Sequence, residues 1–275
     1  MTFGHRIESS LDDRGSLCVG IDPHAGLLEA WGLTDDVAGL SRFAETCVDA
    51  FGDTVAVIKP QSAFFERFGA AGVQVLERTI RECRELGAVV LLDVKRGDIG
   101  STMTAYAQAY LDPSAPLASD AITVSPYLGV GSLQPVFDLA AKHDAGAFVL
   151  AATSNPEGPQ LQEARTAAGK TVAQTVIDEV RARNSEARPL GSIGIVAGAT
   201  IKAGMLSFEA LNGPILAPGV GAQGGTAESV RRLFGSSCRH VLPSVSREVL
   251  RHGPQVVGLH DAVRRLIDEF EFLRA

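Results

Sequence analysis

Long apolar runs, paired cysteines and an excess of positive charge are all missing from this 275-residue chain. The most apolar stretches, such as 88–92, are far too short to cross a bilayer, so no membrane span is expected. A net charge of −7 gives no basic face of the kind that nucleic-acid binders carry, so no nucleic-acid partner is expected. The first fifteen residues hold no apolar core segment, so no signal peptide is expected either.

Cysteine is scarce as well, and its spacing excludes the usual cysteine-based sites. The four cysteines form no C-x-x-C pair and no metal-like spacing with histidine: Cys18, Cys47, Cys83 and Cys238. We therefore expect reduced thiols, a cytoplasmic protein and no metal. Hydrophobic residues at 45 % and charged residues at 21 % are ordinary for a globular protein, which excludes disorder and collagen.

Short apolar runs do recur, and most are followed by a stretch with helical spacing. The runs are 17–21, 55–58, 88–92, 121–124, 147–151, 192–197, 214–216 and 240–242. The expected helices are 37–51, 73–86, 133–142, 170–183, 205–211, 228–234 and 256–273. Alternating strands and helices predict a parallel sheet with right-handed crossovers. Eight such units predict an α/β fold, a (β/α)8 TIM barrel forming one domain over 1–275, with a doubly wound sheet as the alternative.

Polar residues follow several of the apolar runs, where a barrel carries its reactive groups. Asp93 and Lys95 are two residues apart on one strand, so their side chains point the same way, into the barrel. Lys59 follows the preceding strand, and together the three predict an alternating array of ammonium and carboxylate groups. A purely structural cluster of ion pairs is the alternative interpretation.

A glycine-rich loop at 218–225 follows the seventh run and contains G-x-G-x-x-G. No acidic residue stands about twenty positions further on, which argues against a dinucleotide site. Barrels bind phosphate after strands 7 and 8, and Ser246-Arg247 follows the eighth run. These features predict a phosphate site. A second loop, 155–169, is rich in Pro, Gly, Gln and Glu and is expected to be mobile over the site.

The string from Leu91 to Thr102 resembles the D-x-K-x-x-D-I-G-x-T signature of the orotidine 5′-phosphate decarboxylases. Further motifs resemble the longer bacterial subtype and reach nearly every strand end: 20–23, 57–60, 125–129, 153–156 and 218–225. The resemblance implies a homodimeric barrel that converts orotidine 5′-phosphate to UMP and CO2 without a cofactor, as the last step of UMP synthesis.

The resemblance also implies a role for individual residues. Lys95 would stabilise the carbanion at C6 and protonate it, with Asp93 near the departing carboxylate and Lys59 holding the network. Asp98 would reach the neighbouring subunit's site together with a threonine. The remaining implied positions bind substrate or complete that second site: Asp22, Thr102, Thr123, Ser154, Gln223 and Arg247.

One departure from the family pattern flanks Arg247, where Val245 and Glu248 lie close by, so Arg239 and Arg251 are alternative phosphate ligands. Three other functions also fit some of these residues. A related Mg²⁺-dependent 3-keto-L-gulonate 6-phosphate decarboxylase would need an acidic ligand where this chain has Lys59. A Schiff-base aldolase would use a barrel lysine. A phosphate-binding barrel without chemistry would not need the Asp93, Lys95 and Asp98 set.

Overall fold

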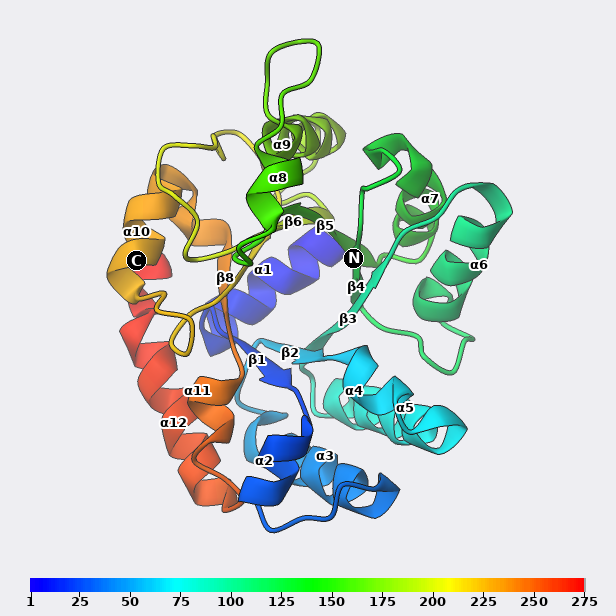
Figure 1. Ribbon diagram of the computed structural model, residues 1–275, viewed down its shortest axis with the longest axis vertical. Coiled ribbons are helices and arrows are strands. Elements are labelled where there is room, and N and C mark those ends of the chain that lie inside the picture. Colours follow the sequence, from blue (N-terminus) through cyan, green and yellow to red (C-terminus); the bar gives the residue numbers. More distant parts are fainter. Residues whose placement is uncertain (275) are drawn as a thin grey trace.

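Eight parallel strands close into a barrel in chain order, as the computed structural model shows for residues 1–274 (Figure 1). The last residue of the predicted domain, 275, lies outside the described residues. The strands are β1 (Cys18–Ile21), β2 (Val57–Pro60), β3 (Val89–Arg96), β4 (Ala121–Val124), β5 (Gly146–Ala152), β6 (Ile193–Ala197), β7 (Ile215–Pro218) and β8 (Val241–Val245). The predicted TIM barrel is confirmed, and the doubly wound alternative is wrong because β1 pairs with β8.

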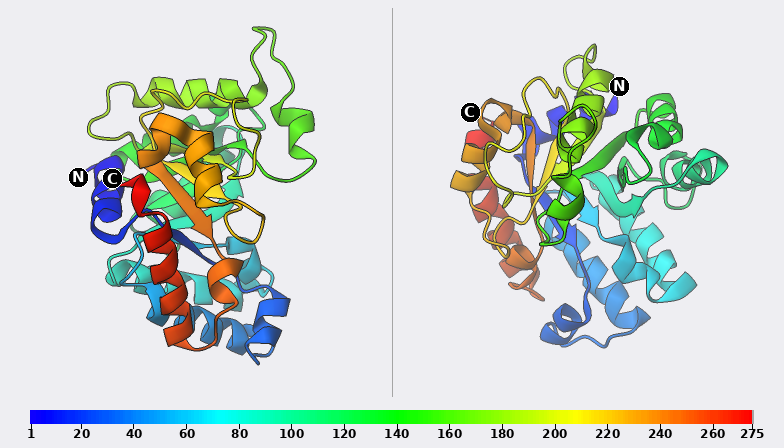
Figure 2. Two further views of the ribbon diagram at one scale, coloured as in Figure 1. Left: turned by 90° about the vertical axis from the view of Figure 1, so that its left-hand side faces the viewer. Right: turned by 45° about the horizontal axis from the view of Figure 1, so that its top comes forward.

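Helices surround this barrel and cover its outer face (Figures 1 and 2). They are α1 (Phe3–Arg14), α2 (Ala25–Ala30), α3 (Val37–Phe51), α4 (Ser62–Glu66), α5 (Gly69–Glu85), α6 (Gly100–Leu111), α7 (Gln134–Lys142), α8 (Gly158–Gln162), α9 (Val172–Asn184), α10 (Ala227–Phe234), α11 (Arg247–Leu250) and α12 (Val256–Glu269). Three short 3-10 helices are η1 (Val130–Leu133), η2 (Gly235–His240) and η3 (Glu271–Leu273). None of the helices in the described chain is long and apolar enough to cross a membrane.

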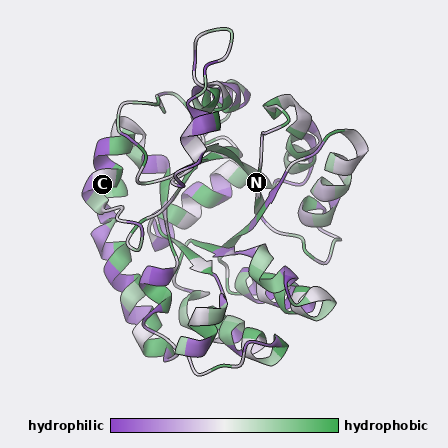
Figure 3. Ribbon diagram, in the orientation of Figure 1, coloured by the Kyte–Doolittle hydropathy of each residue, from purple (hydrophilic) through white to green (hydrophobic). Residues whose placement is uncertain are grey.

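The core lies between the strands and the surrounding helices. Figure 3 shows mostly hydrophobic strands at the centre, and polar colour mostly on the helices around them. Helix α3 has the bounds expected from its apolar spacing, and it buries Leu40, Phe43 and Cys47 among other residues. The regular 3.6-residue period therefore places α3 against the barrel.

Several strands continue past the apolar runs that predict them. The run 88–92 extends to Arg96 in β3, and the run 55–58 extends to Pro60 in β2. The reason is the backbone ladder, which pairs Gly20 with Lys59 in register whatever their side chains are. The polar residues Lys59, Asp93 and Lys95, which follow these apolar runs in the sequence, therefore lie within the last residues of the strands.

Helix α1 is not among the helices predicted from the sequence, and it crosses one end of the ring of strands (Figure 1). It buries Phe3, Ile7 and Leu11, spaced four residues apart on one face, in a cluster with inward residues of the strands. The Phe3 ring meets the Phe148 ring edge-on at a centroid distance of 6.2 Å. At Gly146 a Cβ would lie 2.4 Å from the Phe3 ring, so only glycine leaves room there. The helix seals the amino end of the barrel.

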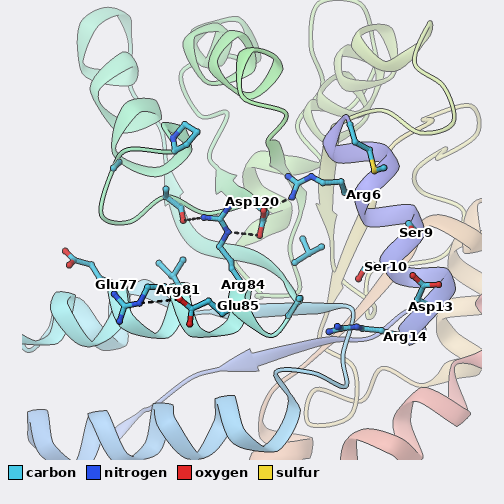
Figure 4. A pocket seen from close by; sticks show the side chains of 18 of the residues that line it. Arg6, Ser9, Ser10, Asp13, Arg14, Glu77, Arg81, Arg84, Glu85 and Asp120 are labelled. Atoms are coloured by element: carbon cyan, nitrogen blue, oxygen red, sulfur yellow. Dashed lines mark hydrogen bonds and ion pairs between the residues drawn. The ribbon is translucent and has the colours of Figure 1, made fainter.

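A buried carboxylate ties this sealing helix to the strands (Figure 4). Asp120, just before β4, accepts from Arg6 of α1 at 2.8 Å and lies 3.5 Å from the Arg84 guanidinium of α5. It also accepts the backbone N–H of Val90 at 2.9 Å. These groups border an open groove of about 940 Å³ at the amino end, which holds none of the predicted site residues.

One expected helix is wrong, and one segment expected to be a loop contains regular structure. The segment 205–211 forms no helix, because Ala210 has a φ of 54° and α9 side chains take its carbonyls: Arg181 donates to Ser207 and Glu209. The segment 155–169 is not a plain loop. It contains α8, and a short antiparallel bridge between Arg165 and Thr171 closes the turn that projects from the barrel in Figure 2.

Candidate active site

A cavity of about 380 Å³ opens at the carboxyl end of the strands, opposite α1. Every strand, or the residue directly after it, supplies part of its lining: Asp22, Lys59, Asp93, Thr123, Leu150, Val196, Leu216 and Ser244. In a barrel this end carries the reactive groups, since the strand ends converge there. Most of the predicted site residues are thus brought together in one cavity.

A charged array lies at the bottom of the cavity. The Asp93 carboxylate accepts from Lys95 Nζ at 2.6 Å through Oδ1, and from Lys59 Nζ at 3.0 Å through Oδ2. The side chains of Lys59 and Asp93 are each 8 % exposed, whereas that of Lys95 is 48 % exposed. Lys95 is therefore the ammonium that a ligand in the cavity can reach.

Mutual attraction keeps the array ionised. Burial raises the pKa of the Asp93 carboxyl, but the ammonium groups of Lys59 and Lys95 outweigh burial and hold that pKa far below its usual range. Burial likewise lowers the pKa of Lys59, yet the carboxylates of Asp93 and Asp22 outweigh it and raise that pKa above its usual range. The array therefore presents fixed charges at neutral pH.

The predicted phosphate loop is closed by its own backbone. Gly219, Gly221 and Gly224 have φ values of 96°, 70° and 87°, a conformation that glycine adopts without strain. The N–H of Gly221 donates to Gly225, and the N–H of Gly224 donates to Gly221, both at 2.8 Å. These two N–H groups hold the loop in shape, so an anion would be held by other groups of this region.

Two side chains that suit an anion lie on this loop and just after β8. Gln223 and Arg247 both line the cavity, and both are exposed. Of the alternative arginines, Arg251 pairs with Glu248, and Arg239 lies 3.9 Å from Glu8 of α1. Neither alternative lines the cavity, which favours Arg247 as the phosphate ligand.

Two polar atoms of the cavity are buried without a partner among residues 1–274. They are Oδ1 of Asp22 and Oγ of Ser246. A Cβ on Gly20 would come within 3.0 Å of both side chains, so the glycine leaves them the space they occupy. Buried polar atoms without partners are costly, and here both face a ligand cavity. They are the sort of groups that a polar ligand would satisfy.

Ser154 lines the cavity from the connection that follows β5. A Cβ on Gly198 would lie only 2.1 Å from its Oγ, so Ser154 packs directly on that glycine. Gln162 of α8 ties this connection down: it accepts the Thr153 N–H at 2.9 Å and donates to the Thr153 hydroxyl at 2.7 Å. Helix α8 thereby fixes the residue next to Ser154.

Asp98 and Thr102 do not line the cavity. Asp98 lies on the connection from β3 into α6, where its carboxylate accepts the N–H of Ile99 at 2.8 Å, and Thr102 lies in the first turn of α6. His24 also lies outside the cavity and caps α2, its Nδ1 accepting the Leu27 N–H at 3.3 Å. Asp98 and Thr102 are thus the predicted site residues that one chain by itself does not bring into the cavity.

The buried cysteines are poor nucleophiles, in line with their expected role as reduced thiols. All four cysteines are free, and Cys18, Cys47 and Cys83 are buried. Burial raises the pKa of Cys18, directly below the array, to about 12. Its thiol therefore stays protonated beside Lys59.

Sequence reasoning missed Gln61 and the apolar wall of the cavity. Gln61 donates to Asp93 Oδ2 at 2.9 Å. The sequence alone could have placed Gln61 in the cavity, because it follows Lys59 by two residues and its side chain therefore points to the same face of the sheet. Leu150, Val196 and Leu216 form apolar lining, and their signal was the same buried runs that predict the strands.

A closed barrel with an ionised Lys–Asp–Lys array at its carboxyl end is the arrangement of an enzyme that stabilises developing charge. Known proteins agree with this class. The sequence pattern of the Orotidine 5'-phosphate decarboxylase / HUMPS family matches residues 15–261, and the chain belongs to this family. Its chemistry is accordingly that of a carboxy-lyase.

Relatives cover the chain from end to end. An orotidine 5'-phosphate decarboxylase of Salinispora tropica is 64 % identical over 266 residues, 97 % of this chain and 96 % of the relative. One from Streptomyces coelicolor is 57 % identical over 268 residues, again covering 97 % and 96 %. A crystal structure from Streptomyces avermitilis, assigned as an orotidine 5'-phosphate decarboxylase, superimposes with a TM-score of 0.97 at 55 % identity, covering 99 % and 96 %.

Proposed function

We propose that this enzyme converts orotidine 5′-phosphate to UMP and CO2 in pyrimidine biosynthesis, with Lys95 as the proton donor to C6. The observation that carries the proposal is the array itself, with an ammonium half exposed to the cavity and held 2.6 Å from a buried carboxylate. The family and its end-to-end relatives supply the substrate.

Charge stabilisation by Lys95 accounts for the chemistry. The bond from C6 to the carboxylate breaks, CO2 leaves, and the electron pair remains on C6. No carbonyl adjacent to C6 takes up this charge, so a fixed ammonium stabilises it as it appears. Lys95 then transfers a proton from Nζ to C6, which yields UMP, and the neutral amine regains a proton from water. We propose that no metal or cofactor takes part.

Asp93 and Lys59 set up this proton donor. The Asp93 carboxylate would lie next to the departing carboxylate, because it holds the Lys95 ammonium that addresses C6. Lys59 balances the second carboxylate oxygen from the other side. The charges are in place before the substrate arrives, so little reorganisation is needed during the reaction.

The other lining residues suit the rest of the substrate. Asp22, whose Oδ1 is buried without a partner, would accept a ribose hydroxyl. Ser154 would contact the pyrimidine edge from the opposite side of the cavity. Gln223 and Arg247 would bind the phosphate, since a guanidinium matches phosphate oxygens in geometry and charge. Binding energy at the phosphate can then serve to position C6 on Lys95.

The test is the absorbance change of orotidine 5′-phosphate with purified protein, with and without EDTA. Wild type should form UMP at the same rate in both, and Lys95→Ala should lose at least about 1000-fold in kcat. Lys142→Ala, on an exposed helix end outside the cavity, is the matched control and should keep full activity. Failure of well-folded wild type to convert this substrate would contradict the proposal; activity lost to EDTA would point to the magnesium-dependent sugar-phosphate decarboxylase.

We also propose that the enzyme works as a homodimer in which Asp98 and Thr102 enter the partner's site. Both residues lie outside their own cavity, Asp98 just before α6 and Thr102 in its first turn. Ile99, Tyr127 and Leu128 are 63 %, 75 % and 52 % exposed, an unusual grouping for a surface in water. A second copy of the chain covering this face would bury them.

Mixing two inactive variants tests this arrangement. Lys95→Ala and Asp98→Ala dimers, unfolded together and refolded, should regain about a quarter of wild-type activity, because half the dimers then hold one complete site. Sedimentation gives the mass. No recovery in a refolded mixture of confirmed dimers would contradict the shared site.

The free cysteines support a cytoplasmic location, which cell fractionation tests.

A further inference from the structure

The carboxyl end of β3 is irregular at the residue proposed as proton donor. Lys95 has a φ of 45°, in the left-handed region. The pairing of β3 with β4 shifts register between Leu92 and Arg96, on either side of it. A residue with a Cβ pays about 1–2 kcal/mol for this conformation, so it persists only where the surroundings hold it.

Thr123 of β4 bonds to both members of the Asp93–Lys95 pair. Its hydroxyl oxygen accepts the backbone N–H of Lys95 at 2.9 Å. Its proton is donated to Asp93 Oδ1 at 2.7 Å. The residue is 1 % exposed. One hydroxyl thus joins the strained backbone of Lys95 to the carboxylate that holds its side chain.

The Asp93 carboxylate has a matched set of donors on its two oxygens. Oδ1 accepts from the Lys95 ammonium and the Thr123 hydroxyl. Oδ2 accepts from the Lys59 ammonium and, at 2.9 Å, from the Gln61 amide. Each oxygen therefore has one charged and one uncharged partner. Turning the carboxylate out of its plane would weaken all four hydrogen bonds at once.

We propose that Thr123 and Gln61 are positioning residues, which fix the plane of Asp93 and the backbone of Lys95 so that the ammonium addresses C6. This replaces the expectation that Thr123 binds substrate, because its proton is given to Asp93. The inference rests on the proposed role of Lys95. It adds to that role the two uncharged groups that hold Lys95 and Asp93 in place.

The competing explanation is that Thr123 only fills space in a buried strand, between Ile122 and Val124. Two substitutions separate these explanations. Thr123→Ser keeps the hydroxyl and loses a methyl group, whereas Thr123→Val keeps the shape and loses the hydroxyl. Gln61→Met is the parallel change on the other oxygen, at a residue that is only partly buried.

Steady-state kinetics and UMP affinity form the first measurement. Loss of a hydrogen bond to a charged group should lower kcat of Thr123→Val by about 10- to 100-fold. Its Kd for UMP should stay within about threefold of wild type, because the ribose and phosphate contacts remain. Thr123→Ser should keep kcat within about threefold, and Gln61→Met should lose about 10-fold.

Crystal structures of the two Thr123 variants form the second measurement, which does not depend on any substrate. Lys95 should leave the left-handed region in Thr123→Val and keep it in Thr123→Ser. The inference is overturned if Lys95 keeps its φ in Thr123→Val, or if the serine variant loses as much kcat as the valine variant. Should Thr123→Val not fold, an unchanged kcat in Gln61→Met would overturn it. Wild type without decarboxylase activity would instead contradict the proposed function.

Discussion

Two buried aspartates, one at each end of the barrel, make opposite use of similar surroundings. Asp93 at the carboxyl end and Asp120 at the amino end are 6 % and 5 % exposed, and each meets two cationic side chains. The cations on Asp120 reach in from α1 and α5 and so tie helices to the sheet. Those on Asp93 come from β2 and β3, inside the ring.

The difference lies in what the cations can face. The Arg6 and Arg84 side chains are 34 % and 45 % exposed, at the edge of an open groove, and both bridge separate elements. Lys95 is as exposed as they are, but it opens into the enclosed cavity while its partner Lys59 is buried. The carboxylate of Asp120, between two arginines from different helices, holds the fold together, whereas that of Asp93 holds a half-exposed ammonium that a ligand in the cavity can reach.

Asp93→Asn should give the largest separation between the two ends. The neutral amide no longer anchors the Lys95 ammonium, so kcat for orotidine 5′-phosphate should fall by at least about 1000-fold. Stability should fall too, by about 3 kcal/mol, because the buried Lys59 loses its counter-charge. The measurements are initial rates and urea unfolding. A variant with near wild-type kcat would remove the distinction between the two aspartates.

Asp120→Asn is the counterpart at the amino end. Both arginines can turn to water, so the loss should be smaller, about 2 kcal/mol of unfolding free energy. The kcat of the folded variant should equal that of wild type, since the groove holds no residue of the active site. Urea unfolding and rates per folded molecule check both numbers. A large loss of kcat at unchanged stability would mean that the two ends are coupled.

Acid should sharpen the comparison further. The folded-state pKa of Asp93 lies below its unfolded value, so its contribution to stability is complete above about pH 5 and is lost as pH falls toward the folded pKa. At pH 3.5 the loss amounts to about 0.7 kcal/mol for an unfolded pKa near 3.9. Between pH 7 and 3.5, wild type should therefore lose about that much more stability than Asp93→Asn. If wild type and Asp93→Asn lose equal stability between pH 7 and 3.5, the lowered pKa of Asp93 is contradicted.

The smallest effect concerns the glycine loop beside the array. A Cβ at Gly221 would meet the Glu248 side chain at 2.9 Å, whereas one at Gly224 would meet nothing within 4 Å. Both have positive φ, so both alanine variants share a backbone cost of about 1 kcal/mol. Gly221→Ala alone should raise KM, by about threefold, by displacing the loop next to Gln223. Identical KM values for the two variants would show that the Glu248 side chain moves aside without displacing the loop.

Regular features made much of this molecule predictable. The alternation of apolar runs and helical stretches identifies the eight-stranded barrel, and the period of two in strands places Asp93 and Lys95 together. Their contact with Lys59 follows from the meeting of strand ends, and the structure confirms it. These inferences need only local pattern and the rule that parallel strands end at one edge.

Irregular features were out of reach for the same reason. Gln61 meets Asp93 through an isolated bridge beyond the regular pairing of β2 with β3, and Thr123 reaches Lys95 across a register shift. The period of two puts Gln61 on the same face as Lys59, but neither of these two contacts follows from that period alone. Helix α1 had a visible signal in Phe3, Ile7 and Leu11, but the polar residues between them obscured it. The missing helix at 205–211 depends on distant side chains of α9, which no local window contains.

The position of α1 also constrains the order of events during synthesis. The ribosome makes this helix before any of the eight strands, yet its apolar face packs on residues from strands all around the ring, including Leu242 of β8. That surface is complete only when β8 has paired with β1. Helix α1 therefore emerges before the strands but finishes docking after them, and until then the apolar side chains of Phe3, Ile7 and Leu11 are exposed to water unless another surface covers them.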